Sequence, residues 1–214
     1  MDLLLTDTEI RVLGCLMEKE MATPEYYPLS LNSLTNACNQ KSNREPVVSF
    51  SEEVAATAIS ALKEKQLVWQ TSAGRVAKFA ENFVKLHNLV NREAALLCVL
   101  MLRGPQTVGE LRGRSERLHG FGDLGEVEAA LEGLAEMGWV TRLPRQPGRK
   151  ESRYMHLLAG PVDADAASCE ADHPPAGTRE PSPTRLQSLE EEVASLRLEL
   201  DQLRDEFQRF KEQF

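Results

Sequence analysis

The stretch EIRVLGCLM, residues Glu9–Met17, returns later in the chain as EAALLCVLM, residues Glu93–Met101. Both begin with an acid and continue with apolar residues at helical spacing. Two more pairs of segments follow in the same order in each copy: SLNSL (Ser30–Leu34) with TVGEL (Thr107–Leu111), and ISALKEKQLV (Ile59–Val68) with LEGLAEMGWV (Leu131–Val140). An order of segments kept across both copies is hard to obtain by chance. We therefore interpret residues 1–88 and 89–160 as two homologous domains.

Each copy carries signals for three helices and then a β-hairpin. Thr6-x-x-Glu9 and Thr107-x-x-Glu110 are capping boxes, which open helices. We expect the third helices from about Ser51 to Lys65 and from about Leu124 to Met137. Each third helix passes into a β-rich segment that contains a Gly turn. The sequence thus predicts a mainly α fold with small β-hairpins (α+β), built as two tandem winged helix-turn-helix domains.

The composition changes after residue 160. Residues 161–183 are rich in Ala, Asp, Pro and Ser, so we expect a disordered linker. Residues 184–214 then repeat apolar side chains in steps of three and four, which is typical of a coiled coil. The predicted dimer interface is Leu186, Leu189, Val193, Leu196, Leu200, Leu203, Phe207 and Phe210. Oppositely charged g and e positions favour a parallel homodimer, and the alternative is a helix that folds back on its own domains.

The segment CNQKSNREPV (Cys38–Val47) lies in the predicted turn before the third helix of the first copy. In a winged helix this turn meets DNA phosphates, and its polar side chains are suitable donors. The candidate nucleic-acid ligands here are Asn39, Lys41, Ser42, Asn43 and Arg44. The alternative is that these side chains cap helix ends and only turn the chain. Both interpretations stay open.

The second copy places its positive charge beside the third helix. Its candidate nucleic-acid ligands are Arg112 and Arg114 before that helix, and Arg145, Arg149, Lys150 and Arg153 in the wing. Such a wing suits a phosphate backbone or a minor groove. It is also compatible with a solvated loop that balances the acidic third helix, or with a protein partner. Because both third helices lack base-reading residues in their first turns and begin with acids, we do not expect sequence-specific reading of the major groove.

Composition excludes several classes of protein. No apolar run is long enough for a membrane span, and MDLLLTDTEI is not a secretory signal. The four Cys form no C-x-x-C pair and the four His show no metal-ligand spacing, so we expect a reduced cytoplasmic protein without cofactor or metal. No catalytic motif occurs, and we expect no enzyme. The net charge of −8 comes mainly from residues 161–214, which hold 6 Lys/Arg against 13 Asp/Glu, so it does not argue against nucleic acid.

Four segments carry a family resemblance: LTDTEIRVLGCLMEKE, YYPLSLNSLTNACNQKSNREPV, REAALLCVLMLRGPQTVGELRGRSERLHGF and RQPGRKESRYMHLLAG. They resemble the YceH-like family of uncharacterised bacterial proteins over nearly all of residues 5–160. The resemblance implies a tandem winged helix. It implies no activity and assigns no functional residue.

These observations favour a non-enzymatic, homodimeric tandem winged-helix protein that binds nucleic acid, for example as a transcriptional regulator. The alternative is a protein–protein adaptor that uses its winged helices as docking modules.

Overall fold

The computed structural model describes residues 3–71, 76–145 and 151–160, which lie in one compact unit. The predicted linker (161–183), the predicted coiled coil with its dimer interface (184–214), and the wing residues Arg149 and Lys150 lie outside the described residues.

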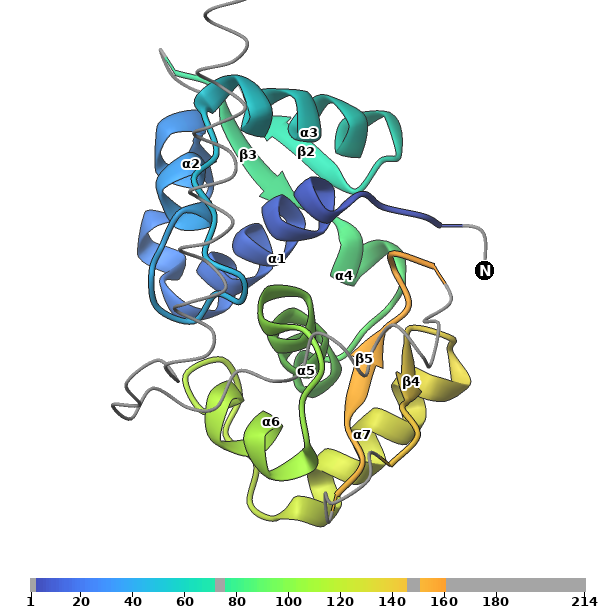
Figure 1. Cartoon of the computed structure of the whole chain (residues 1–214). Coiled ribbons are helices and arrows are strands. Elements are labelled where there is room, and N and C mark those ends of the chain that lie inside the picture. The colour runs from blue at the N-terminus through green and yellow to red at the C-terminus, as the bar shows by residue number, and fades with distance from the viewer. Residues whose placement is uncertain (1–2, 72–75, 146–150, 161–214) are drawn as a thin grey trace, which may run out of the picture. The chain divides into compact units, whose positions relative to one another are not determined.

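The first repeat combines α-helices with a three-stranded sheet (Figure 1). Its elements are α1 (Asp7–Ala22), the short 3-10 helix η1 (Pro24–Tyr26), β1 (Leu29–Ser30), α2 (Leu31–Cys38), α3 (Glu52–Glu64), β2 (Val68–Thr71) and β3 (Lys78–Glu81). The sheet order is β1-β3-β2, and both pairs are antiparallel. Helix α4 (Phe83–Leu86) then leads to the second repeat.

The second repeat follows the same order with a smaller sheet. Its elements are α5 (Asn91–Arg103), α6 (Val108–Ser115), α7 (Leu124–Glu136), β4 (Val140–Arg142) and β5 (Tyr154–His156). Strands β4 and β5 are antiparallel. A single bridge between Gln106 and Tyr154 stands where β1 pairs with β3 in the first repeat. The structure confirms a mixed α+β chain, mainly helical with small antiparallel sheets.

Local capping explains where the helices begin. The Thr6 hydroxyl accepts a hydrogen bond from the Glu9 amide at 3.3 Å, and the Glu9 carboxylate accepts one from the Thr6 amide at 2.7 Å. Thr107 and Glu110 form the same reciprocal pair. Each pair satisfies backbone N–H groups that the first helical turn leaves without partners.

The two repeats share one hydrophobic core, centred on α1 and α5 (Figure 1). Helix α1 is buried on all sides from Glu9 to Glu18, because α2, α3 and β3 cover part of its surface and α5 covers the rest. Gly14 permits the close approach of the two helices, since a Cβ added there would lie 3.0 Å from the Leu102 side chain. The Cys98 thiol also lies 3.4 Å from the Gly14 carbonyl. The repeats are therefore joined by packing, not only by the chain.

In the described part of the chain, no helix combines the length and the apolar character that a membrane crossing requires.

Candidate functional site

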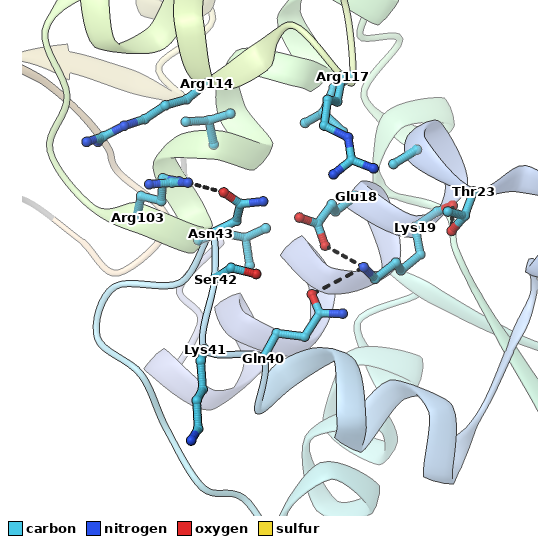
Figure 2. Close-up of a pocket in the computed structure, with 14 residues that line it drawn as sticks. Glu18, Lys19, Thr23, Gln40, Lys41, Ser42, Asn43, Arg103, Arg114 and Arg117 are labelled. Atoms are coloured by element: carbon cyan, nitrogen blue, oxygen red, sulfur yellow. Dashed lines mark hydrogen bonds and ion pairs between the residues drawn. The ribbon is translucent and has the colours of Figure 1, made fainter.

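A pocket of about 550 Å³ opens where the two repeats meet (Figure 2). We call it the junction pocket. The first repeat contributes the end of α1 and the loop after α2, and the second contributes the end of α5 and the region of α6 with the residues after it. The lining residues are Glu18, Lys19, Ala22, Thr23, Gln40, Lys41, Ser42, Asn43, Val99, Leu102, Arg103, Arg114, Arg117 and Leu118.

The lining of the junction pocket is strongly cationic. Five of its side chains are Lys or Arg and one, Glu18, is acidic. Glu18 is already paired, because Arg44 binds its two carboxylate oxygens at 2.6 and 3.0 Å and Lys19 lies 3.2 Å from it. Among the described residues, Lys41 and Arg117 form no ion pair. The pocket thus holds positive charge in excess of what its own acid neutralises.

The ionisation of the lining side chains reflects this excess. Burial alone would raise the pKa of Glu18, but its hydrogen bonds with Arg44 and the charges of Arg44 and Lys19 lower it below its ordinary value. Burial lowers the pKa of Arg103, and the nearby positive charge of Arg114 lowers it further. A bound anion would relieve the repulsion between these two guanidinium groups.

Arg44 does not face solvent, contrary to its interpretation as an exposed phosphate ligand. Its side chain is 0% exposed. Besides binding Glu18, it donates from Nε to the Ala37 carbonyl at 3.1 Å and from a guanidinium nitrogen to the Asn43 carbonyl at 2.9 Å. Arg44 therefore anchors the loop after α2 to α1 and is not available to a ligand.

The other predicted residues of this loop divide into structural and exposed ones. The Asn39 amide binds both the N–H and the carbonyl of Phe50, at 2.7 and 2.8 Å, and so braces the loop internally. Lys41, Ser42 and Asn43 are exposed at the junction pocket. In Figure 2 the Lys41 side chain points away from the other labelled groups, whereas Asn43 accepts a hydrogen bond from Arg103. The structure thus brings these three residues to the pocket and leaves Asn39 in a bracing role.

The predicted cations of the second repeat do not gather at one place. Arg114 lines the junction pocket, where it binds the Gln106 side chain and lies 3.8 Å from Glu110. Arg112 is instead engaged with the carbonyls of Phe121 and Gly122, at 3.3 and 2.8 Å.

The described wing residues differ in their surroundings. Arg153 donates to the Pro105 carbonyl at 2.7 Å and lies 3.2 Å from Glu110, so it joins the wing to the start of α6. Arg145 is exposed.

Three cations of the pocket were missing from the predicted set: Lys19, Arg103 and Arg117. Lys19 and Arg103 occupy equivalent places, since each lies in the last turn of its repeat's first helix. The alignment of Glu9–Met17 with Glu93–Met101 therefore places Lys19 and Arg103 at equivalent positions, and this equivalence could have indicated both residues. Arg117 has no such counterpart, and only the folded chain shows that it faces Glu18 across the pocket (Figure 2).

The third helices offer a different surface. Helix α3 exposes Glu52, Glu53 and Glu64 beside the single cation Lys63. Helix α7 exposes four acids and has no Lys or Arg; they are Glu126, Glu128, Glu132 and Glu136. These faces repel phosphate, so the junction pocket is the better candidate for an anionic ligand. Within residues 3–71, 76–145 and 151–160, no group of three or more His, Cys, Asp or Glu is arranged to hold a metal ion.

Comparison with known proteins identifies a family. A family model described as "Protein of unknown function, DUF480" matches residues 5–149. The UPF0502 protein of Solibacter usitatus is 53% identical over 210 residues, which are 97% of this chain and 100% of the relative. The UPF0502 protein of Pelobacter propionicus is 52% identical over 218 residues and 100% of both chains. That of Photobacterium profundum is 43% identical over 215 residues, 96% of this chain and 97% of the relative.

These matches confirm the resemblance to an uncharacterised bacterial family that the sequence motifs predicted. The chain belongs to the DUF480 family of proteins, whose relatives named above are UPF0502 proteins.

Proposed function

We propose that this chain is a non-enzymatic nucleic-acid-binding protein made of two winged-helix domains, and that it holds phosphate at the junction pocket. The observation that carries the proposal is that five cationic residues from both repeats line one pocket whose single acid, Glu18, is already paired. Guanidinium and ammonium groups arranged in this way are typical phosphate ligands.

The order of the elements supports the winged-helix part of the proposal. The first repeat runs helix, strand, helix, helix, strand, strand, with its first strand paired to its last. The second repeat keeps this order, and the bridge from Gln106 to Tyr154 replaces the first strand pair. In such a domain, the third helix and the wing normally meet DNA.

Here the mode of binding differs from that norm. The exposed faces of α3 and α7 are acidic, so they do not suit insertion into a major groove. Contacts from the junction pocket would reach phosphates and carry little sequence information. We therefore propose binding that depends on salt and only weakly on base sequence, with residues 184–214 joining two copies as a parallel homodimer.

A gel-shift experiment across salt concentrations tests the proposal. Replacing Arg103 and Arg117 by Gln removes two charges from the junction pocket. If both cations meet phosphate, the slope of log affinity against log salt for a blunt duplex falls by about 1.8, or about 0.9 for each lost contact. The matched control replaces Lys63 and Lys85, two exposed lysines outside the pocket, and should keep the original slope.

An adaptor function is the second candidate. The first turns of α3 and α7 each expose an apolar side chain among acids, Val54 at 40% and Leu124 at 47%. Such mixed surfaces suit a protein partner better than they suit phosphate. If no duplex is retarded at low salt, the nucleic-acid proposal is refuted and the adaptor takes its place.

A further inference from the structure

The junction pocket is lined by four apolar side chains, which we call the floor, and by five cations, which we call the rim. Val99 and Leu102 are buried in the described chain, at 4% and 3% exposure, and Ala22 and Leu118 are half-buried beside them. The cations nearest to solvent, Lys41 and Arg117, are exposed. A ligand that fills the pocket therefore needs an apolar or aromatic body as well as negative charge.

A regular duplex does not meet this requirement. Its bases are stacked inside, and its outer surface presents phosphate and sugar. Duplex phosphates can therefore contact the rim and leave the floor empty. An unpaired nucleotide offers both parts, because its phosphate is anionic and its base presents a flat π-face.

Polar groups that line the same pocket suit the rest of a nucleotide. The side chains of Gln40 and Thr23 line the pocket on the α1 side, and Ser42 and Asn43 line it near Arg103 (Figure 2). Amide and hydroxyl groups of this kind donate to and accept from sugar hydroxyls and base edges. Arg side chains also stack on bases, so Arg117 can serve either part of the ligand. The volume of about 550 Å³ lies in the range of small-molecule sites.

We propose that the junction pocket binds one unpaired nucleoside phosphate, with the phosphate among Lys19, Arg103 and Arg117 and the base on the apolar floor. This inference rests on the proposed function, because it assigns a ligand to the same site. The nucleoside phosphate has two sources: a free nucleotide, or the unpaired 5′-phosphorylated end of a strand. In either case the ligand touches both repeats.

Titration calorimetry on the full chain tests the chemistry with AMP, adenosine and inorganic phosphate. AMP should bind about tenfold or more tighter than inorganic phosphate, because stacking adds to the charge interaction. Adenosine should bind more weakly than AMP because it lacks the anion. Equal affinities for AMP and inorganic phosphate would overturn the inference.

Two variants separate the floor from the rim. Ala22→Phe fills the floor without changing the charge, and Leu118→Asn makes it polar. Each should lower AMP affinity and leave the binding of a blunt duplex unchanged, with thermal melting as the check of folding. Because the two substitutions perturb packing differently, a loss of folding in one leaves the other as the test. If a folded floor variant binds AMP as the parent chain does, the base does not lie there and the inference fails.

The source of the nucleotide is decided with DNA ends. A duplex with a short 5′-phosphorylated single-stranded overhang should bind tighter than a blunt duplex, and Ala22→Phe should remove the difference, if the ligand is a strand end. If the overhang brings no gain and AMP still binds, the ligand is a free nucleotide.

The two proposals fail separately. If blunt-duplex binding depends on Arg103 and Arg117 but AMP binds no tighter than inorganic phosphate, only the nucleotide site is refuted. AMP binding without any duplex binding refutes only the proposed nucleic-acid function.

Discussion

Arg44 shows how much one side chain contributes to the shape of the site. It is buried, it binds Glu18 through two nitrogens, and it holds two backbone carbonyls of its own loop. Removing it leaves the buried Glu18 carboxylate with Lys19 as its remaining ion-pair partner. We expect Arg44→Ala to lower the free energy of unfolding by about 3–5 kcal/mol, measured by urea denaturation.

Lys41 provides the matched control for Arg44. It lies three residues earlier in the same loop but is exposed, so Lys41→Ala should change the free energy of unfolding by about 0.5 kcal/mol or less. Arg44→Lys should lie between the two, because an ammonium group cannot form the bidentate pair. If Arg44→Ala left the free energy of unfolding unchanged, the anchoring role of Arg44 would be contradicted.

The raised pKa of Glu81 predicts that the stability of the fold depends on pH. Burial raises its pKa to about 7, although the Val84 amide, which donates to it at 3.0 Å, acts in the opposite direction. The folded protein therefore binds the Glu81 proton more tightly than the unfolded chain does. This contribution to stability is fully present below the ordinary value of 4.5 and is lost as pH rises through about 7.

The variant Glu81→Gln tests that dependence. It keeps an acceptor for the Val84 amide and removes the titration, so its melting temperature should decline less than that of the parent chain between pH 4.5 and pH 7. Parallel melting curves for the two proteins over this range would show that Glu81 titrates normally.

The sequence could not show that Arg44 is buried and Lys41 is exposed. Both are cations in one polar turn, and the local pattern CNQKSNREP treats them alike. The difference comes from Glu18, which is 26 positions away in the chain and lies on another helix. Burial that depends on so distant a partner leaves no local signature. Arg112 is a second case, because its carbonyl partners, Phe121 and Gly122, lie in the loop before α7 and no pattern in the sequence pairs them with it.

At the scale of elements, local signals predicted much of the secondary structure. The capping boxes at Thr6 and Thr107 are present, and the third helices end within one residue of their predicted bounds. The faces of helices were harder to predict. Val54 lies at helical spacing from Ala58 and Leu62, which favours one apolar stripe, but it is 40% exposed, whereas its neighbour Ala55 is fully buried. Helix α1 has no solvent face between Glu9 and Glu18, because a second repeat covers what one domain alone would expose.

The crossing of α1 and α5 predicts a large effect at Gly14. Its added Cβ would already meet Leu102 at 3.0 Å and Met101 at 3.3 Å, so a branched side chain must push the helices apart. We expect Gly14→Val to cost about 1–3 kcal/mol of unfolding free energy in chemical denaturation.

Gly113 supplies the opposite case. It lies inside α6, and a Cβ there would meet open space. Gly113→Ala should therefore stabilise the protein by about 0.5–1 kcal/mol, through helix propensity and a less flexible unfolded chain. If both Gly variants shifted stability in the same direction, the close approach at Gly14 would not control the packing.

At the scale of the whole molecule, the junction pocket lay beyond sequence reasoning. The repeat itself was visible in the chain, and it placed Lys19 and Arg103 in equivalent positions. Whether the two side chains lie close together depends on how the repeats pack against each other. A repeat pattern in the sequence does not predict this packing. The acidic third helices were visible in the sequence, and they argue against insertion into the major groove. The structure shows these acids exposed.

The charge pattern of residues 184–214 predicts the oligomeric state. Deleting residues 161–214 should leave a folded monomer, because the core described above comes from the two repeats. Light scattering measures the mass of the truncated chain and of the full chain, and we expect the full chain to be a dimer. A truncated chain that stays dimeric would move the interface to the repeats and refute the coiled-coil prediction.

The shared core has a consequence for how the protein is made. During synthesis α1 leaves the ribosome first, but α5, which covers part of its apolar surface, is complete only after Arg103. At ~5–20 residues per second, the chain from Ala22 to Arg103 takes ~4–16 s to appear. For those seconds the part of α1 that α5 later covers lacks its partner, so we expect slower translation across residues 23–103 to prolong the exposure of this apolar surface.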